Sequence, residues 1–249
     1  MKVIITGASS GIGAALAHEY AKQGALLGLI ARRADVLEQL KNSLPATVAV
    51  YAVDVRDAQA LTAAAADFIA RHGCPDVVIA NAGISRGTLT EKAEDLTVFQ
   101  KIFDTNVMGM VKTFQPFLPP MLERRRGTLV GIASIAGFRG LPGGGAYSAS
   151  KAAAVSCLES LRVELHNSGI NVLTVCPGYV ATPMTANNPY PMPFIISAEA
   201  AARKIISAIA LRRGFVVIPW QIALLGRILK ILPDWLYDLL FAKAPRKPR

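Results

Sequence analysis

A tyrosine and a lysine, Tyr147 and Lys151, stand four positions apart, a spacing that places both side chains on one face of a helix. A free tyrosine has a pKa of about 10, and a nearby ammonium group lowers that pKa because it favours the phenolate. Such a tyrosine can give a proton to a developing alkoxide, or take one from an alcohol, near neutral pH. Ser134, upstream of this pair, ends an apolar run, and its hydroxyl can hydrogen-bond a carbonyl oxygen on which charge builds.

A glycine-rich loop stands near the start of the chain, where residues 6–13 read Thr-Gly-Ala-Ser-Ser-Gly-Ile-Gly. The loop follows an apolar run and opens a helical pattern. Its glycines permit a tight turn and let backbone N–H groups approach a pyrophosphate, and the helix N-terminus adds its dipole. An ordinary turn is the alternative for such a loop taken alone. The preceding strand pattern favours a dinucleotide site.

The elements that must position these residues alternate along the chain between short apolar runs and longer helical patterns. This alternation predicts an α/β, Rossmann-like doubly wound sheet of about seven parallel strands with helices on both faces. The strands are expected at Val3–Thr6, Leu26–Ala31, Thr47–Val53, Asp76–Ala80, Gly127–Ala133, Ile170–Cys176 and Phe215–Ile218. The helices are expected at Gly13–Gln23, Ala34–Leu44, Ala58–His72, Asp95–Phe117, Tyr147–Asn167 and Ala198–Leu211.

Two segments interrupt this alternation. Residues 179–197 hold four prolines and follow a strand, so we expect a lid loop over a ligand. Residues 219–249 lie beyond the last strand and read as a C-terminal helical extension. With 249 residues, of which 52% are hydrophobic, the chain can bury one sizeable core. We therefore expect residues 1–249 to form a single dinucleotide-binding catalytic domain.

The net charge of +10 is concentrated at the C-terminal end, where residues 203–249 hold ten Lys or Arg against two acids. This charge suggests an anionic surface such as phospholipid, or a solvated tail, and no nucleic-acid motif accompanies it. Residues 220–243 are rich in Leu, Ile and Trp with basic residues interspersed, which suggests an amphipathic helix pair on a membrane. The alternative is a helical extension that packs on the enzyme or on a second subunit.

Three cysteines stand far apart without a CxxC pair, which fits a reducing compartment and argues against a disulfide framework. The N-terminus enters an apolar strand at once, so we expect a cytoplasmic location, with peripheral contact at the inner face of a membrane left open. His18, His72 and His166 have no ligand cluster at metal spacing, and we predict no metal.

Taken together, residues 2–218 resemble the classical short-chain dehydrogenase/reductases. The loop at 6–13 is similar to the TGxxxGxG loop of that family. The resemblance implies a catalytic tetrad of Asn106, Ser134, Tyr147 and Lys151, in which the backbone carbonyl of Asn106 holds a water that links Lys151 to solvent. It also implies a cofactor site formed by Gly7, Ser9, Ser10, Gly11, Ile12, Gly13, Arg32, Arg33, Asp54, Val55, Asn81, Ala82, Gly83, Tyr147, Lys151, Pro177, Gly178, Val180 and Thr182.

The end of the second strand bears on the choice of cofactor. An NAD enzyme wants a carboxylate there for the ribose 2′-hydroxyl, whereas a 2′-phosphate wants arginine. The sequence reads Ala31-Arg32-Arg33, with no acid until Asp35, and an arginine fork can grip a phosphate bidentately. A solvated arginine pair that caps the loop is the alternative. We predict NADP(H) in preference to NAD(H).

These residues predict an NADP(H)-dependent oxidoreductase that moves hydride between the nicotinamide and a carbonyl/alcohol pair, with Tyr147 as general acid/base. The alternative is a catalytically silent redox sensor or scaffold, which has no need to keep the tetrad. The substrate is expected to be a small hydrophobic carbonyl or alcohol. The residues expected around it are largely apolar, namely Ile135, Phe138, Tyr179, Met184 and Phe194. The family suggests a homodimer or a homotetramer.

Overall fold

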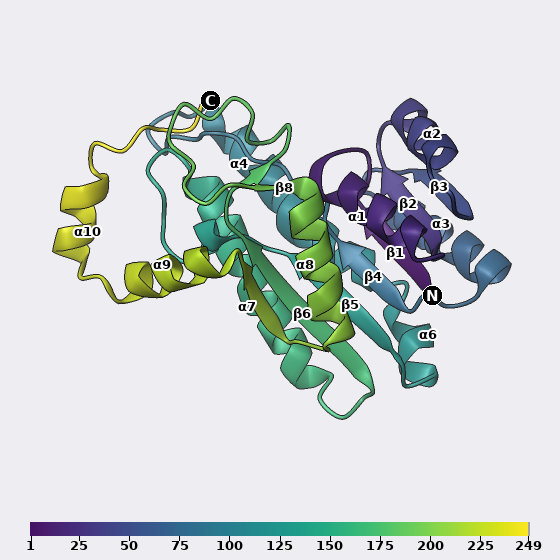
Figure 1. Ribbon diagram of the computed structural model, residues 1–249. Helices are drawn as coiled ribbons and strands as arrows, with labels where there is room; N and C mark the ends of the chain where they lie inside the picture. The colour runs from purple at the N-terminus through teal and green to yellow at the C-terminus, as the bar shows by residue number, and fades with distance from the viewer. Residues whose placement is uncertain (249) are drawn as a thin grey trace.

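The computed structural model describes residues 1–248 and has a seven-stranded sheet at its centre (Figure 1). The strand order is β3-β2-β1-β4-β5-β6-β9, and every neighbouring pair is parallel. The order reverses between β1 and β4, and such a point opens a crevice at the carboxyl ends of the strands. The predicted fold is confirmed. The strands are β1 (Lys2–Thr6), β2 (Leu26–Ala31), β3 (Val48–Ala52), β4 (Val77–Ala80), β5 (Gly127–Ile132), β6 (Ile170–Pro177) and β9 (Phe215–Ile218).

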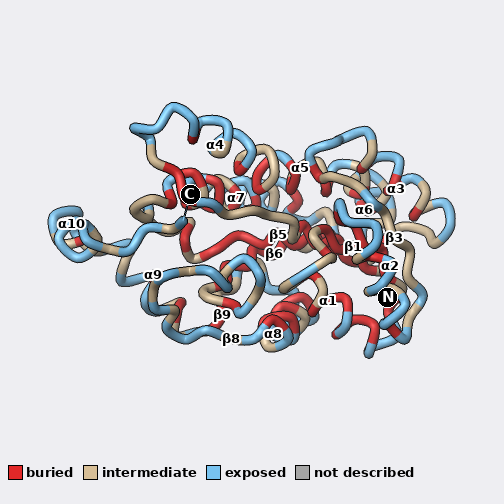
Figure 2. Tube along the Cα trace, turned by 90° about the horizontal axis from the view of Figure 1, so that it is seen from above, coloured by how far each residue is buried: buried red, intermediate tan, exposed pale blue. Residues whose placement is uncertain are grey.

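Helices cover both faces of the sheet, as Figure 2 shows with the buried strands between them. One core forms where α1, α2 and α8 pack on the sheet, and a second where α3, α5, α6 and α7 pack on the other face. The helices are α1 (Gly11–Lys22), α2 (Ala34–Ser43), α3 (Ala58–His72), α4 (Asp95–Phe103), α5 (Gly109–Phe114), α6 (Leu118–Glu123), α7 (Gly145–Glu164), α8 (Ala198–Ala210), α9 (Trp220–Ile231) and α10 (Asp234–Phe241).

The first strand shows why its sequence is continuously apolar. Val3 and Ile5 pack into the core beneath α1 and α8, whereas Ile4 packs into the core beneath α3 and α7. All three side chains are fully buried. A strand covered on both faces needs apolar residues at odd and even positions alike, so the sheet holds its polar chemistry at its carboxyl edge.

The helix expected at Asp95–Phe117 is interrupted in the structure. It consists of α4, a π-helical turn at Asp104–Met108, and α5, which ends at Phe114. Pro116 lies just beyond and has no N–H to continue the helical hydrogen bonds. The π turn inserts one extra residue into the helix and so reorients the side chains on it, as such turns often do near functional sites.

The two interrupting segments take different forms. The loop at 179–197 is closed at its base by a short parallel pair, β7 (Val180–Ala181) and β8 (Ile196–Ser197). The C-terminal extension forms α9 and α10, and α10 lies at the outer edge of the molecule in both views (Figures 1 and 2). Within residues 1–248, no helix combines the length and apolar character that crossing a membrane requires.

Candidate active site

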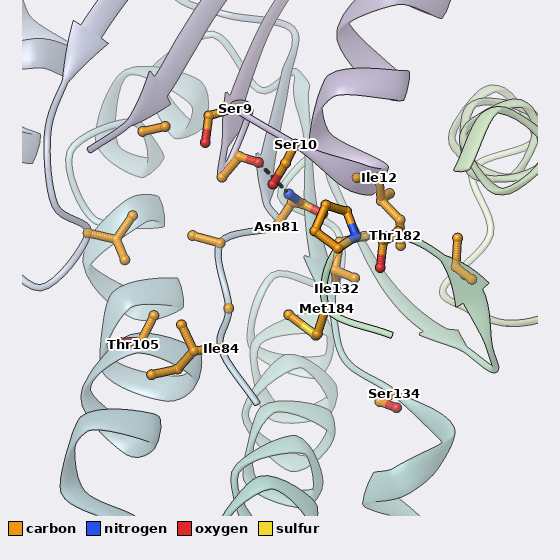
Figure 3. A pocket seen from close by; sticks show the side chains of 18 of the residues that line it. Ser9, Ser10, Ile12, Asn81, Ile84, Thr105, Ile132, Ser134, Thr182 and Met184 are labelled. Carbon is orange, nitrogen blue, oxygen red and sulfur yellow. Dashed lines mark hydrogen bonds between the residues drawn. The ribbon is translucent and has the colours of Figure 1, made fainter. Parts of the chain in front are cut away.

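A groove of about 300 Å³ runs along the carboxyl edge of the sheet. In Figure 3, Ser9 and Ser10 of the glycine-rich loop lie at one end and Ser134 at the other. The wall between them comes from the loops that follow β1, β2, β3, β4 and β6. The groove therefore joins the two sequence features that suggested nucleotide binding and acid/base chemistry.

The glycine turn at the head of the groove excludes side chains. Gly7 and Gly11 have φ of 65° and 56°, which L-residues rarely adopt. A Cβ on Gly7 would also lie 2.8 Å from the Cα of Ala82. Ser10 precedes α1 without making a side-chain capping bond, so its hydroxyl does not occupy the first-turn N–H groups of the helix. Open N–H donors at a helix N-terminus fit the diphosphate of a dinucleotide.

Hydrogen bonds across the point where the strand order reverses hold this turn in place. The Thr6 hydroxyl accepts from the backbone N–H groups of Asn81 at 3.1 Å and Ala82 at 3.2 Å. The Asn81 side-chain amide donates to the carbonyls of Thr6 at 3.0 Å and Gly7 at 3.2 Å. The loop after β4 is therefore bonded to the glycine turn after β1.

Positive charge gathers where the groove meets the end of β2. Arg32 and Arg33 both line it, and the Arg33 guanidinium donates to the Ser9 hydroxyl at 3.0 Å and to the Ser9 carbonyl at 3.3 Å. Asp54 is paired with Arg56 at 2.7 Å, and hydrogen bonding to Arg56 lowers the pKa of this carboxyl group. Arginine side chains held at this end fit a phosphate group on the ribose.

At the other end of the groove, Lys151 lies beside Tyr147. The Lys151 Nζ donates to the Ile132 carbonyl at 2.8 Å and lies 5.8 Å from the centroid of the Tyr147 ring. Burial lowers the pKa of Lys151 to about 8, with a smaller opposing effect from Cys176. Burial also raises the pKa of Tyr147, and the neighbouring Ser134 hydroxyl opposes that rise. A partly buried phenol and a buried ammonium group thus lie side by side at this end of the groove.

Asn106 braces this arrangement through its side chain. Its Oδ1 accepts from the Ile84 N–H at 2.8 Å, and its Nδ2 donates to the Ile84 carbonyl at 3.0 Å and the Ser150 hydroxyl at 3.0 Å. The Ser150 hydroxyl donates in turn to the backbone carbonyl of Tyr147 at 2.7 Å. The π turn, the loop after β4 and α7 are therefore fixed relative to one another at the catalytic end.

Comparison with known proteins agrees with this geometry. Residues 1–191 match the family model described as short chain dehydrogenase. The chain belongs to the short-chain dehydrogenase family. This short-chain dehydrogenase is 40% identical over 238 residues to an uncharacterized oxidoreductase of Myxococcus xanthus, with 94% of each chain covered. It is therefore an oxidoreductase with a nicotinamide-dinucleotide-binding fold.

Two solved structures extend the comparison. A short-chain dehydrogenase from Streptomyces avermitilis superposes on this dehydrogenase with a TM-score of 0.82 at 27% identity, and 97% of each chain is covered. L-Sorbose reductase from Gluconobacter frateurii, determined with NADPH and L-sorbose, gives a TM-score of 0.78 at 27% identity. That match covers 87% of this chain and 94% of the reductase.

The structure of this dehydrogenase brings almost all of the predicted site residues together along the groove. Gly13 and Asn106 instead support it from behind. A Cβ on Gly13 would collide with the Gly7 carbonyl, and Asn106 bonds to the loop after β4. The predicted residues that line the groove are Gly7, Ser9, Ser10, Gly11, Ile12, Arg32, Arg33, Asp54, Val55, Asn81, Ala82, Gly83, Ser134, Tyr147, Lys151, Pro177, Gly178, Val180 and Thr182.

Several other lining residues of this dehydrogenase were not singled out from the sequence as cofactor contacts. Most of them stand at the ends of parallel strands or in the loop after β6, so the rule that ligands meet the carboxyl edge could have found them. They are Ala31, Val53, Ile84, Thr105, Ile132, Ala133, Pro183, Met184 and Thr185.

Two residues expected beside the substrate, Ile135 and Phe138, contact the C-terminal extension. Gly226 of α9 lies so close to both that a Cβ there would stand 2.8 Å from the Phe138 ring. Apolar residues after β5 therefore hold α9, and a side-chain-free position on α9 makes the close approach possible. The sequence did not predict this contact, because no local pattern distinguishes an apolar residue that lines a substrate site from one that packs against a helix.

Proposed function

We propose that this dehydrogenase moves hydride between NADP(H) and a carbonyl/alcohol pair, with Tyr147 as the general acid/base. The carrying observation is the buried Lys151 ammonium 5.8 Å from the Tyr147 ring, at the end of a groove that begins with an open helix N-terminus. When bound, the nicotinamide would supply or accept the hydride. We take residues 1–249 as one catalytic domain, with 179–197 as its lid.

The residues of the chain divide the proton chemistry among them. In the reducing direction, the Ser134 hydroxyl donates a hydrogen bond to the carbonyl oxygen and the Tyr147 phenol gives that oxygen its proton. The Lys151 ammonium stabilises the phenolate that remains. The same groups act in reverse when an alcohol is oxidised. By its resemblance to the family, Asn106 would hold the water that returns a proton to Lys151.

Arginine at the end of β2 supports NADP(H) as the preferred cofactor. Arg32 and Arg33 line the groove where a ribose phosphate would lie, and Arg33 is held by Ser9. L-Sorbose reductase, with the same fold, was determined with NADPH. A hydrogen bond to a charged group contributes about 1.5–3 kcal/mol, which is about tenfold to a hundredfold in affinity.

The test is a titration of NADPH and NADH into the wild type and into the double variant Arg32→Ala/Arg33→Ala. We expect the double variant to weaken NADPH binding about tenfold to a hundredfold and NADH binding far less. Arg71→Ala is the matched control, because Arg71 pairs with Asp67 on α3, away from the groove. Equal loss for both cofactors, or no preference in the wild type, would contradict the assignment. A carbonyl panel without any turnover would favour the silent sensor or scaffold.

We also propose that the outer faces of α9 and α10 contact an anionic lipid surface, such as the inner face of a membrane. The structure leaves large apolar side chains exposed there: Trp220 is 70% exposed, Ile231 82% and Leu239 72%. Arg227 and Lys230 of α9 and Lys243 after α10 supply positive charge, and of the two acids on α10 Asp234 is paired with Arg139. Apolar side chains beside basic ones suit anionic headgroups better than a second copy of an equally basic extension.

Flotation with vesicles of phosphatidylglycerol or phosphatidylcholine tests the lipid proposal. We expect the wild type to float with the anionic vesicles and Ile231→Asp/Leu239→Asp to stay behind. Val163→Asp is the control, because Val163 is 63% exposed on α7, away from the extension. If the wild type does not float, and Ile231→Asp/Leu239→Asp has half the solution mass of the wild type, a second copy of the chain covers this face. The predicted homodimer or homotetramer would be read from the same mass measurement.

A further inference from the structure

The last residues of the described chain return to the active site. The Gly87 N–H donates to the Pro248 carbonyl at 2.9 Å, and the Lys247 Nζ donates to the Ser85 hydroxyl at 2.8 Å. Figure 1 shows this tail running from α10 across to the side on which the strands end. Ser85 and Gly87 belong to the loop after β4, whose earlier residues line the groove. The tail, residues 244–248, therefore lies against the wall of the catalytic site.

Two glycines form the seat of this tail. A Cβ on Gly87 would collide with the Lys247 carbonyl and lie 2.9 Å from the Pro248 carbonyl. A Cβ on Gly143, whose φ is 69°, would lie 2.8 Å from the Cβ of Arg246. The two glycine loops are joined by a bond from the Thr88 N–H to the Gly143 carbonyl at 2.9 Å. The main chain of the tail thus fits a surface without side chains, which fixes where Lys247 lies.

Lys247 brings a second positive charge to the catalytic tyrosine. Its Nζ lies 5.8 Å from the centroid of the Tyr147 ring, the same separation as for Lys151. Lys247 is partly buried, and this burial lowers its pKa. Among the ion pairs formed within residues 1–248, none includes Lys247. A partly buried ammonium without an acidic partner is stabilised when a ligand supplies the opposite charge.

The groups that residues 1–248 place around Lys247 do not supply that charge. Ser85 offers a neutral hydroxyl, Tyr147 an aromatic ring, and Lys151 and Arg246 are themselves cationic. An oxidised nicotinamide is also positive. The phosphates of the proposed cofactor would lie at the opposite end of the groove, beside the glycine turn, so at this end the substrate is the component that could carry the negative charge.

We propose that Lys247 is a specificity-determining residue that binds an anionic group, a carboxylate or a phosphate, on the carbonyl substrate. This inference rests on the proposed function and deepens it. Met184 lines the groove and contributes an apolar wall. The substrate class is therefore an apolar carbonyl compound that carries one anionic group.

A series of aryl oxo acids, with increasing distance between ketone and carboxylate, tests this inference when each acid is compared with its methyl ester. Matched oxo phosphates in a second arm distinguish the two anions. We expect the wild type to prefer an acid or a phosphate to the neutral compound. Lys247→Met should lower that preference, measured as the ratio of kcat/KM values, about tenfold or more, since bonds to charged groups contribute about 1.5–3 kcal/mol. Lys243→Met is the control, because Lys243 is an exposed lysine immediately before the tail.

A second variant disturbs the glycine surface that holds the tail and leaves Lys247 in the chain. Gly87→Ala places a methyl group against the tail, whereas a Cβ on Gly140 meets nothing within 4 Å, so Gly140→Ala is its control. We expect Gly87→Ala to reduce the preference for the anionic compound as Lys247→Met does, and Gly140→Ala to leave it in place. An unchanged preference in both Lys247→Met and Gly87→Ala would overturn the inference.

Calorimetric binding of the acid and its ester separates this inference from the proposed function. A chain that binds the acid through Lys247 but reduces no ketone would contradict the proposed function and keep the anion site. A chain that reduces acid and ester equally, with and without Lys247, would keep the proposed function and overturn the anion site.

Discussion

The two ends of the groove are built differently. At the cofactor end, hydrogen bonds join the ends of neighbouring strands, as between Thr6 and Asn81, and the side chains behind them are fully buried. At the substrate end, the walls are segments that follow β6 and dock through a few contacts, such as Gly226 on Phe138 and Pro248 on Gly87. Large exposed apolar side chains gather on these later segments.

This difference teaches where chemistry and selectivity reside in the fold. In the proposed function, proton transfer and cofactor binding would depend on atoms held by the sheet and by α7, so small displacements are resisted by the whole core. Substrate choice would depend on segments with few bonds, which tolerate sequence change and can move. Changes at the residues held by the sheet and by α7 should therefore reduce turnover or cofactor binding, and changes in the segments that follow β6 should alter substrate selectivity or local stability.

The largest effect is expected for Tyr147→Phe, which removes the acid/base and keeps the ring. We expect kcat/KM to fall about 10²- to 10⁴-fold, the range for loss of a general acid, while the Kd for NADPH stays within a few-fold of the wild type. Steady-state kinetics and a cofactor titration measure the two quantities. Tyr51→Phe is the control, because Tyr51 bonds Asp67 away from the groove. Equal turnover in both variants would rule out the proposed acid/base.

A smaller effect is expected for Lys151→Met, which should increase the stability of the protein rather than reduce a property of it. The unfolded chain holds the lysine proton with a pKa near 10.5, and the folded protein with a pKa of about 8. The unfolded state therefore binds more protons between these values, so this group makes the protein more stable as pH rises from about 8 to 10.5 and less stable below that window.

Removing the charge should therefore stabilise the protein at neutral pH, at the cost of its activity. We expect Lys151→Met to raise the free energy of unfolding at pH 7 by about 1–3 kcal/mol, less whatever is lost with its bond to the Ile132 carbonyl. Chemical denaturation at pH 7 and pH 10.5 measures the gain, which should shrink at the higher pH. A loss of stability of equal size at both pH values would show that the buried Lys151 ammonium group does not destabilise the folded protein.

The smallest and most local effect is expected for Arg139→Met. The Arg139 guanidinium donates to the Leu232 carbonyl at 3.0 Å, pairs with Asp234 at 2.9 Å and lies 4.3 Å from the Tyr237 ring centroid. Without these bonds we expect the free energy of local opening in α9 and α10 to fall by about 1–2 kcal/mol, so that their amide hydrogens exchange faster. The amide hydrogens of β1 should exchange as slowly as in the wild type. Hydrogen exchange read by mass spectrometry measures both regions. Unchanged exchange in α10 would show that other contacts hold the extension.

How far the sequence could predict this molecule follows the same division. The continuous apolar strands predicted the seven-stranded parallel sheet, although not the order of its strands. The glycine turn predicted the nucleotide loop through a local signal, whereas most other groove residues were predicted by resemblance to the family. The π turn at Asn106 had no such signal. The position of Lys247 could not be predicted, because it depends on Gly87 and Gly143 forming a seat far away in the sequence. The site roles assigned by resemblance stay predictions.

The central claim is that Tyr147 gives a proton at the place where hydride from NADPH arrives, and a single-turnover experiment with NADPH deuterated at the transferable position tests it most directly. With a reducible ketone, the account predicts that the wild type places deuterium on the carbinol carbon. It also predicts that Tyr147→Phe, saturated with the same cofactor, does so at least about a hundredfold more slowly. Deuterium transfer at the wild-type rate in Tyr147→Phe would contradict it.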